Sequence, residues 1–242
     1  MYNIPDWRGT KIANARVFFN SEIKDEDNLL YLDSDTFVVD KLDDLEKYNG
    51  PINMVLDVMP QNKINEMNLN TKYYCNSGVL WINMKKWNEL DCDKKIVDTL
   101  KGNIKFTYPD QDLLNIALKD DIHLLPPNYN LFTTDYYYSL PFLLMYYKQT
   151  DIKRYSFKEI IDAKKNPIIL HGTPLSFMKD YTIDTSIHPY NDLYNKFLNE
   201  INIENKNEKI NIIEKIIIDT ILHTKVLFPK EIREKIKKLV KK

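Results

Sequence analysis

The stretch "NLLYLDSDTFVVDKL", residues 28–42, decides how we interpret the fold. A short apolar run ends abruptly at two aspartates, Asp33 and Asp35, that flank a single serine. A run without polar alternation predicts a strand that is buried on both faces. Because side chains at positions i and i+2 of a strand point to the same face, the two carboxylates are expected to project together beyond its carboxyl end.

Strands and helices alternate along the rest of the chain. We predict strands over 52–58, at the start of 75–90, in 122–130 and over 167–172. Helices are predicted over 10–23, over 39–50, in the second part of 75–90 and over 108–121. This alternation predicts an α/β fold with a mixed sheet. Open sheets of this class bind ligands beyond the carboxyl ends of their strands, where the two aspartates are expected.

Composition and charge exclude several classes of protein. The 242 residues are 43% hydrophobic and 29% charged, with a formal net charge of −1, so nothing favours binding to nucleic acid. No run approaches the roughly 18 apolar residues of a membrane span. The first ten residues lack the apolar core of a signal peptide, and only two cysteines occur. A cytoplasmic protein is therefore expected.

Two adjacent carboxylates repel each other, and a divalent cation offsets that repulsion. A cation held by Asp33 and Asp35 keeps open positions for phosphate oxygens, so the sequence predicts a site for a metal and a diphosphate. The alternative is a polar turn after a strand, since the D-x-D pattern is common.

One enzyme class with this pattern is the haloacid-dehalogenase-like phosphatases. On that interpretation Asp33 is the nucleophile and Asp35 is the acid/base. This class also needs an acidic pair that follows a later strand. The only candidate is "LKDD", residues 118–121, which lies on or just past a predicted helix, so the fit is poor.

A second class matches over most of the chain. The chain resembles glycosyltransferase family 8 in four motifs, which are "ANARVFFNSEIKDEDNLLYLDSDTFVVDKLDDL", "YCNSGVLWINMKKWNE", "YPDQDLLNIAL" and "IILHGTPLSFMKDY". The resemblance implies a Rossmann-like nucleotide-diphospho-sugar transferase fold of the GT-A type, with a mixed sheet and C-terminal helices. It also implies a retaining hexosyltransferase that uses a UDP-sugar, similar to the enzymes of bacterial lipopolysaccharide biosynthesis. The catalytic domain is expected over residues 1–202.

The resemblance further implies roles for individual residues. The metal, Mn²⁺ or Mg²⁺, is expected on Asp33, Asp35 and His171. The reacting face of the sugar is expected to meet Asp110 and Gln111, with Asp112 as an alternative cap of the helix start. Residues expected to bind the donor or acceptor are Arg16, Asp57, Asn76, Ser77, Gly78, Gly172 and Lys179.

The family retains the configuration of the transferred sugar, and the sequence offers no carboxylate well placed for a double displacement. Gln111 is expected on the face of the sugar from which a nucleophile would attack, but a neutral amide is a weak nucleophile. We therefore predict attack from the face on which the diphosphate leaves, with the leaving phosphate taking the acceptor's proton. The acceptor is expected to be a glycan or a lipid-linked saccharide.

Two departures from the family pattern bear on activity. Family members carry roughly 70–80 further residues at the amino end, so we expect this chain to lack the first strand of the nucleotide-binding half and the pocket for the uracil base. A truncated remnant without catalytic activity is therefore a further alternative. In addition, Gly172 follows His171 directly, no Trp follows, and Lys179 is displaced from the family's lysine position.

The end of the chain, residues 203–242, predicts a basic amphipathic helical tail. Its last 18 residues carry eight Lys or Arg and two Glu, with a narrow apolar stripe at Ile232, Ile236 and Leu239. Such a helix binds an anionic membrane surface through residues 225–242, which would place the enzyme at the inner face of a membrane. The alternative is a terminal helix that packs on its own domain.

Overall fold

The computed structural model describes residues 17, 23, 25–57, 71, 73–102, 104–133, 135, 155–172 and 190–203. The predicted helix over 10–23 therefore lies outside the described residues apart from Val17 and Ile23, and so do Arg16, Lys179 and residues 204–242.

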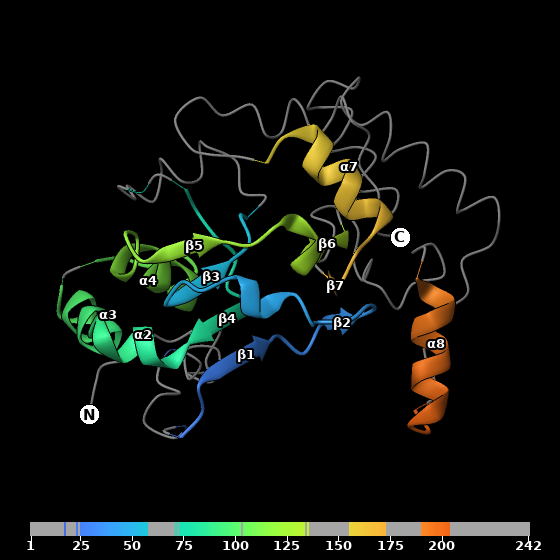
Figure 1. Ribbon diagram of the computed structural model, residues 1–242, viewed down its shortest axis with the longest axis horizontal. Coiled ribbons are helices and arrows are strands. Elements are labelled where there is room, and N and C mark those ends of the chain that lie inside the picture. The colour runs from blue at the N-terminus through green and yellow to red at the C-terminus, as the bar shows by residue number, and fades with distance from the viewer. Residues whose placement is uncertain are drawn as a thin grey trace, which may run out of the picture.

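A four-stranded mixed sheet forms the centre of the described structure (Figure 1). Its strand order is β1 (Asn28–Leu32), β4 (Val79–Asn83), β3 (Ile52–Met54) and β5 (Ile122–Leu124). Strand β4 is antiparallel to both β1 and β3, whereas β3 and β5 are parallel. Strands β1, β3 and β5 therefore run in one direction, and their carboxyl ends lie at the same edge.

Both faces of this sheet are packed, which explains why its strands do not alternate between apolar and polar residues. Along β4, Leu80 and Ile82 contribute to one apolar cluster, while Val79 contributes to a second cluster on the other face. Strand β1 follows the same rule, but its side chains are only half-buried after the exposed Asn28. The prediction of a fully buried strand over 28–33 is therefore wrong in degree, because among the described strands β1 pairs with β4 alone.

Three of the described helices cover the face of the sheet on which Leu80 and Ile82 lie. They are α2 (Met84–Glu89), α3 (Cys92–Lys101) and α4 (Pro109–Ala117), and they gather at one end of the sheet in Figure 1. Trp87, Ile96 and Leu114 are fully buried between these helices and the strands. Asn83 caps α2 by accepting a hydrogen bond from the backbone N–H of Lys86, so β4 passes directly into the helix.

A second sheet has three strands, in the order β2 (Thr36–Val38), β7 (Ile169–His171) and β6 (Leu131–Phe132). Strand β7 is antiparallel to β2 and parallel to β6, and His171 is opposite both Thr36 and Phe132. The turn that contains Asp33 and Asp35 connects β1 of the first sheet to β2 of the second. The D-x-D turn is therefore the first of the chain connections between the two described sheets, which are also joined between β2 and β3 and between β5 and β6.

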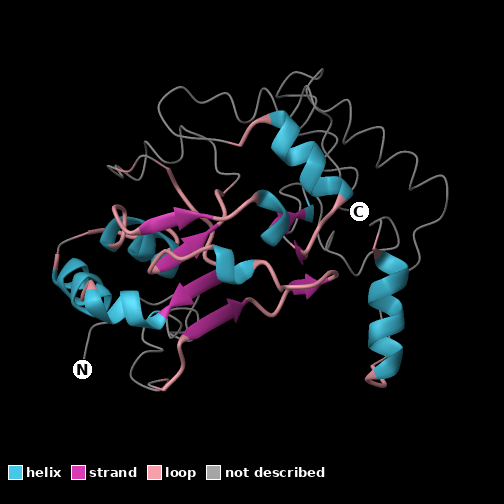
Figure 2. Cartoon of the chain, in the orientation of Figure 1, coloured by secondary structure: helices cyan, strands magenta, loops and turns pink. Residues whose placement is uncertain are grey.

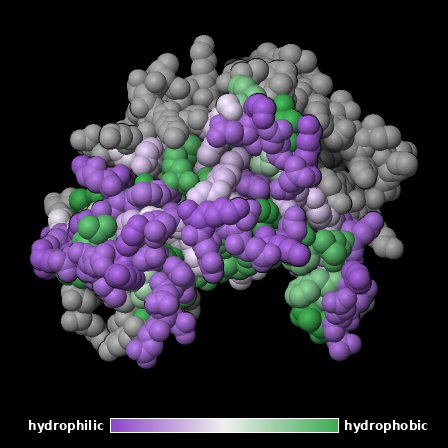
Figure 3. Space-filling model, viewed as in Figure 1, coloured by the Kyte–Doolittle hydropathy of each residue, from purple (hydrophilic) through white to green (hydrophobic). Residues whose placement is uncertain are grey.

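The remaining helices accompany the second sheet (Figure 2). Helix α7 (Phe157–Lys165) begins with a capping box between Ser156 and Glu159, and helix α8 (Asn191–Glu200) contacts β2 through rings at Phe37, Tyr194 and Phe197. Figure 3 shows hydrophobic atoms on the surface of α8, where Leu193, Phe197 and Ile201 are exposed. Among the described helices, none combines the length and the apolar character that crossing a membrane requires.

Two single turns of 3-10 helix complete the described elements, namely η2 (Leu45–Lys47) and η3 (Pro127–Tyr129). The predicted helix over 39–50 is wrong, because only η2 forms there. The strands and helices together confirm the predicted α/β class with a mixed sheet.

Candidate active site

Polar residues gather at the edge of the first sheet where β1, β3 and β5 end. Asp33 follows β1 directly, and Asp57 follows β3 after two residues. Strand β4 runs the opposite way, so its start lies at this same edge, and Asn76, Ser77 and Gly78 lie there directly before it. Backbone hydrogen bonds hold these segments together, from Asp33 N to the Gly78 carbonyl at 2.8 Å and from Asn76 N to the Val55 carbonyl at 2.9 Å.

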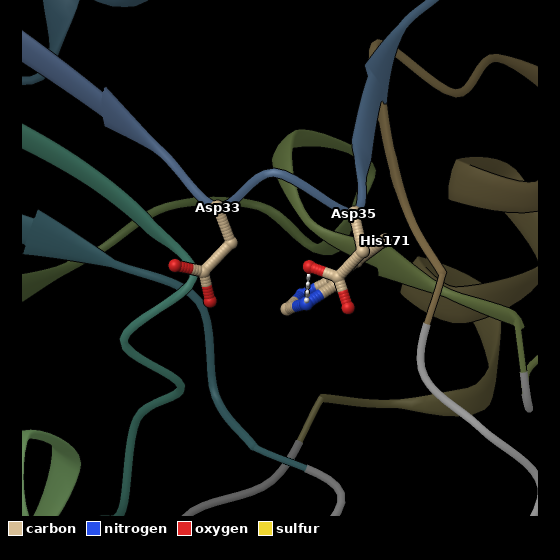
Figure 4. Close-up of side chains that lie close together, drawn as sticks. All are labelled: Asp33, Asp35 and His171. Atoms are coloured by element: carbon tan, nitrogen blue, oxygen red, sulfur yellow. Dashed lines mark ion pairs between the residues drawn. The ribbon is translucent and has the colours of Figure 1, made fainter. Parts of the chain in front are cut away.

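The predicted metal ligands converge. One ligand atom from each of Asp33, Asp35 and His171 lies within 4.8 Å of the others. Figure 4 shows the two carboxylates, from the turn after β1, and the imidazole, from the end of β7, pointing into one space. Nε2 of His171 lies 3.3 Å from Oδ1 of Asp35. His171 is buried, Asp33 is half-buried and Asp35 is exposed, so the group opens to solvent on one side.

The backbone of this turn is fixed by several hydrogen bonds. Both the amide and the hydroxyl of Thr36 donate to the Asp33 carbonyl, at 3.0 and 2.7 Å. Gly172 N donates to the Asp35 carbonyl at 2.7 Å, which ties the chain after His171 to the turn. Tyr31 donates to Oδ1 of Asp33 at 2.7 Å. The backbone of the turn and the Asp33 carboxylate are therefore held in place by contacts within the protein.

Gly78 is required for space. A Cβ at this position would lie 2.3 Å from Cε1 of His171 and 3.0 Å from Oδ2 of Asp33. Contacts that short are not tolerated, so any side chain here would displace the imidazole or the carboxylate. The absence of a side chain at Gly78 keeps the space between the candidate ligands open.

A second polar cluster lies beside the first. Oδ2 of Asp57 accepts hydrogen bonds from Asn76 Nδ2 and from Gln111 Nε2, each at 3.0 Å. Oε1 of Gln111 accepts from Asn76 Nδ2 and from the Ser77 amide, each at 3.1 Å. Ser77 Oγ donates to Oδ2 of Asp110 at 2.7 Å. The predicted residues Asp57, Asn76, Ser77, Asp110 and Gln111 thus form one hydrogen-bonded group.

Helix α4 brings Asp110 and Gln111 to this group from its first turn, with Pro109 at the first helical position. Asp112 holds the start of the helix. Its Oδ2 accepts from the amides of Thr107 and Tyr108, at 2.6 and 2.9 Å, and its Oδ1 accepts from the Tyr74 hydroxyl. Burial raises the pKa of the Asp112 carboxyl, and burial together with Asp112 raises the pKa of Tyr74. These contacts favour the capping alternative for Asp112.

One buried residue of the site was missed by sequence reasoning. Asn130 is fully buried, with Oδ1 2.8 Å from Nδ1 of His171 and Nδ2 2.9 Å from Oδ1 of Asn76. It belongs to none of the four motifs, and no local pattern in "PPNYN" indicates a link to residues 41 or 54 positions away.

The acidic pair that a phosphatase requires is not brought to the site. Asp120 and Asp121 lie in the turn before β5, at the edge opposite Asp33. Asp121 instead pairs with Lys95, whose Nζ lies 2.7 Å from Oδ2 of the carboxylate. The structure therefore contradicts the phosphatase interpretation.

The comparison with protein families agrees with these positions. The family model described as glycosyl transferase family 8 matches residues 8–173, which include both polar clusters. The chain belongs to glycosyl transferase family 8. The matched region includes three segments that the resemblance in sequence had identified, namely the D-x-D turn, residues 76–78 and the start of α4.

The curated relatives are named as glycosyltransferases. The lipopolysaccharide 1,2-glucosyltransferase of Escherichia coli is 34% identical over 120 residues, which cover 45% of this chain and 35% of that protein. The glycosyltransferase GlyE of Streptococcus pneumoniae is 32% identical over 121 residues, covering 47% of this chain and 26% of GlyE. The matched region thus spans about a third or less of the length of these relatives.

Solved structures of this type share the fold. The galactosyltransferase LgtC, in complex with donor and acceptor sugar analogs, superposes with a TM-score of 0.55 at 21% identity, covering 79% of this chain and 67% of LgtC. The bifunctional glycosyltransferase WbbM superposes with a TM-score of 0.54 at 16% identity, covering 77% of this chain and 37% of WbbM. These matches confirm the predicted GT-A fold.

Proposed function

We propose that this chain is a retaining hexosyltransferase that moves galactose or glucose from a UDP-sugar to a glycan or a lipid-linked saccharide. The observation that carries the proposal is the position of the Asp33, Asp35 and His171 group beside the cluster of Asp57, Asn76 and Gln111, in a chain of family 8. One group suits a diphosphate with its cation, and the other suits the hydroxyls of a sugar.

The residues present fit a divalent cation. Two carboxylates and an imidazole are a suitable donor set for Mn²⁺ or Mg²⁺, and the imidazole favours Mn²⁺. The ligand atoms lie within 4.8 Å of one another, and Gly78 leaves the space that a Cβ would fill. When bound, the cation would offset the negative charge that develops on the diphosphate as it leaves the sugar.

The second cluster would bind and orient the donor sugar. Asp57, Asn76 and Gln111 hold one another through hydrogen bonds, so their remaining donor and acceptor positions are presented in fixed directions. Asp110, supported by Ser77, adds a carboxylate at the start of α4. The exposed side of Asp35 would face the diphosphate.

The same contacts support attack from the face on which the diphosphate leaves. Gln111 is a neutral amide whose oxygen already accepts two hydrogen bonds, so it is a poor candidate for a nucleophile. The carboxylates of Asp57, Asp110 and Asp112 are all engaged as acceptors within the protein. The acceptor hydroxyl would then form its bond to the anomeric carbon as the bond to the phosphate oxygen breaks. That phosphate oxygen would take the proton, and the configuration would be retained.

Calorimetric titration of the 242-residue chain with UDP-glucose and UDP-galactose, with and without Mn²⁺, tests the proposal. We expect binding that depends on the cation and is weakened at least tenfold in Asp33→Asn and in His171→Ala. Asp98→Asn is a matched control, because Asp98 pairs with Lys94 and Lys101 on the exposed surface of α3. Equal binding by all four proteins would contradict the proposal.

The stereochemistry has its own test. NMR of the product formed with a saccharide acceptor distinguishes the two anomers, and an inverted product would exclude attack from the leaving face. The contact of residues 225–242 with a membrane stays a separate proposal. Sedimentation with anionic vesicles, compared with a chain that ends at residue 224, tests it.

A further inference from the structure

Asn130 connects the two polar clusters of the site. It ends the η3 turn, and its side chain lies between His171 on β7 and Asn76 before β4. The residues that follow it also hold His171. Phe132 is its partner in the sheet register, and Thr133 donates to the His171 carbonyl at 3.0 Å. Asn130 and His171 are both buried, so water does not replace these contacts.

The orientation of the Asn76 amide is fixed by groups that have a single hydrogen-bonding role. The Gly78 amide, which is only a donor, lies 2.9 Å from Oδ1 of Asn76. On the other side, the Asp57 carboxylate lies 3.0 Å from Nδ2 of Asn76. The Gly78 N–H and the Asp57 carboxylate therefore fix which end of the Asn76 amide is the oxygen. That oxygen, Oδ1, is also the atom that faces Asn130.

The orientation of Asn130 then follows. The oxygen of Asn76 accepts, so the group of Asn130 that faces it at 2.9 Å must be the NH₂. The oxygen of Asn130 consequently faces Nδ1 of His171 at 2.8 Å. Because an amide oxygen only accepts, Nδ1 of His171 must carry a hydrogen.

The other ring nitrogen faces the candidate metal site. With the hydrogen on Nδ1, the neutral ring directs the lone pair of Nε2 toward Asp35, whose Oδ1 lies 3.3 Å away. Histidine ligands of metals commonly donate their second N–H to a protein acceptor, and this contact fixes the ring's tautomer and orientation. Here that acceptor is an amide whose own orientation derives from the Gly78 backbone.

We propose that Asn130 is a positioning residue that fixes His171 in the Nδ1–H tautomer and thereby prepares Nε2 to bind the divalent cation. The inference rests on the proposed function for the identity of the ligand. The hydrogen on Nδ1 itself follows from the hydrogen bonds alone.

The tautomer is measurable in the protein without metal. The chain contains four histidines, so long-range ¹H–¹⁵N correlation spectra of protein labelled with ¹⁵N-histidine are simple to assign, with His171→Gln identifying the signal. We expect the Nδ1–H pattern for His171 at alkaline pH. Asn130→Ala should lose the fixed pattern. Asn130→Asp should keep the hydrogen on Nδ1, because a carboxylate still accepts from Nδ1, although this variant loses the donor to Oδ1 of Asn76.

Affinity for Mn²⁺, followed by electron paramagnetic resonance of the free ion, provides the second measurement. Asn130→Ala should bind Mn²⁺ about 10- to 100-fold more weakly than the unmodified chain. Asn128→Ala is the matched control, because Asn128 lies in the same turn and contacts Asn166 instead. It should leave both the tautomer and the affinity unchanged.

An Nε2–H pattern for His171 in the unmodified chain would overturn the proposal, and this result does not require any variant to fold. Retention of the Nδ1–H pattern in Asn130→Ala would overturn it as well. If the unmodified chain bound no Mn²⁺ but showed the Nδ1–H pattern that Asn130→Ala loses, the role of Asn130 would stand and the metal-dependent function would fail.

Discussion

Gly78 leaves open the space beside His171 and Asp33, and it gives the most direct test at the scale of single residues. In Gly78→Ala the new methyl group would lie 2.3 Å from Cε1 of His171, so the ring must move. We expect affinity for Mn²⁺ to fall at least tenfold, a loss of the size seen when ligand-orienting groups are removed. Calorimetric titration with Mn²⁺ measures the change.

Gly102→Ala is the matched control for this substitution. Gly102 follows α3, where a Cβ would lie 3.1 Å from the Thr99 carbonyl, and it is exposed. The control should bind Mn²⁺ as the unmodified chain does. If Gly78→Ala also bound with unchanged affinity, the three ligands would not share the space that this glycine keeps open.

Ser77 offers a second test, since its hydroxyl donates to Asp110. Ser77→Ala removes this donor from a buried carboxylate, which should lower the free energy of unfolding by about 1 kcal/mol. Turnover with the UDP-sugar should fall at the same time, because Asp110 loses its orientation. Urea unfolding and the rate of UDP release measure the two effects.

Thr99→Val removes a comparable hydroxyl, one that donates to the Lys95 carbonyl within α3, and it should leave turnover unchanged. A Ser77→Ala variant with full turnover would show that Asp110 needs no support from Ser77.

The sequence predicts the candidate metal ligands better than the residue that connects the two polar clusters. Asp33 follows one short apolar run and His171 ends another, and ligands of α/β folds bind where strands end. The two strands belong to different sheets, which the sequence does not predict. Asn130 carries no such signal, because its contacts join segments 41 and 54 positions apart. Only the packing of η3 against β7 and β4 brings these side chains together.

At the scale of secondary-structure elements, the start of α4 depends on Asp112. In Asp112→Ala, the amides of Thr107 and Tyr108 and the hydroxyl of Tyr74 would all lose their acceptor. We expect the free energy of unfolding to fall by about 3 kcal/mol, since buried donors without acceptors are costly. Urea unfolding followed by circular dichroism measures the loss.

Asp120→Ala controls for the removal of an aspartate near the same helix, because Asp120 is exposed in the turn after α4. It should change the free energy of unfolding by less than about 0.5 kcal/mol. The loss in the free energy of unfolding for Tyr74→Phe should lie between those of the two aspartate variants, because it removes one of the three donors to Asp112. Equal stabilities for Asp112→Ala and Asp120→Ala would contradict a structural role for Asp112.

The elements that the sequence predicts correctly have strong local signals. Helix α4 begins at Pro109 as expected, and β7 ends at His171 as expected. Strands β2 and β6 were missed, since three and two residues carry no period, and their pairing with β7 defines them. The helix over 39–50 is wrong because only the single turn η2 forms there, although Leu42, Leu45 and Tyr48 all pack on one apolar cluster. A single turn gains few of the hydrogen bonds that stabilise a longer helix.

At the scale of the whole molecule, buried tyrosines and a buried thiol make stability fall at alkaline pH. Burial raises the pKa of Cys92 to about 12 and that of Tyr129 to about 12, and it also raises those of Tyr74 and Tyr155. Above the ordinary pKa values of about 9 to 10, the unfolded chain releases these protons while the folded chain keeps them. The stabilisation is complete below pH 9 and is lost progressively as the pH rises.

Urea unfolding between pH 8 and pH 11 measures this slope, with each proton contributing about 1.4 kcal/mol per pH unit. In Tyr155→Phe, one of the groups with a raised pKa is absent, so the slope above pH 10 should be shallower. The variant Tyr108→Phe changes an exposed tyrosine and should keep the original slope. A free energy of unfolding that did not change across this range would contradict the burial of these groups.

The overall α/β architecture is predicted from the alternation of strands and helices, and the solved structures confirm it. The division into two sheets is not predicted, because β2, which pairs with β7 after the D-x-D turn, has only three residues and carries no periodic pattern. The boundary between a catalytic domain over 1–202 and a tail over 203–242 stays a prediction.

The turn at residues 33–35 has a consequence for how the chain tolerates changes in length. Surface turns usually accept an inserted residue at little cost. This turn holds two of the candidate ligands and also sets where Thr36 meets His171 across β2 and β7. One added or deleted residue would shift that pairing by a position and turn the side chains of β2 to the opposite face. The spacing of two aspartates around one serine is therefore constrained by architecture as well as by chemistry.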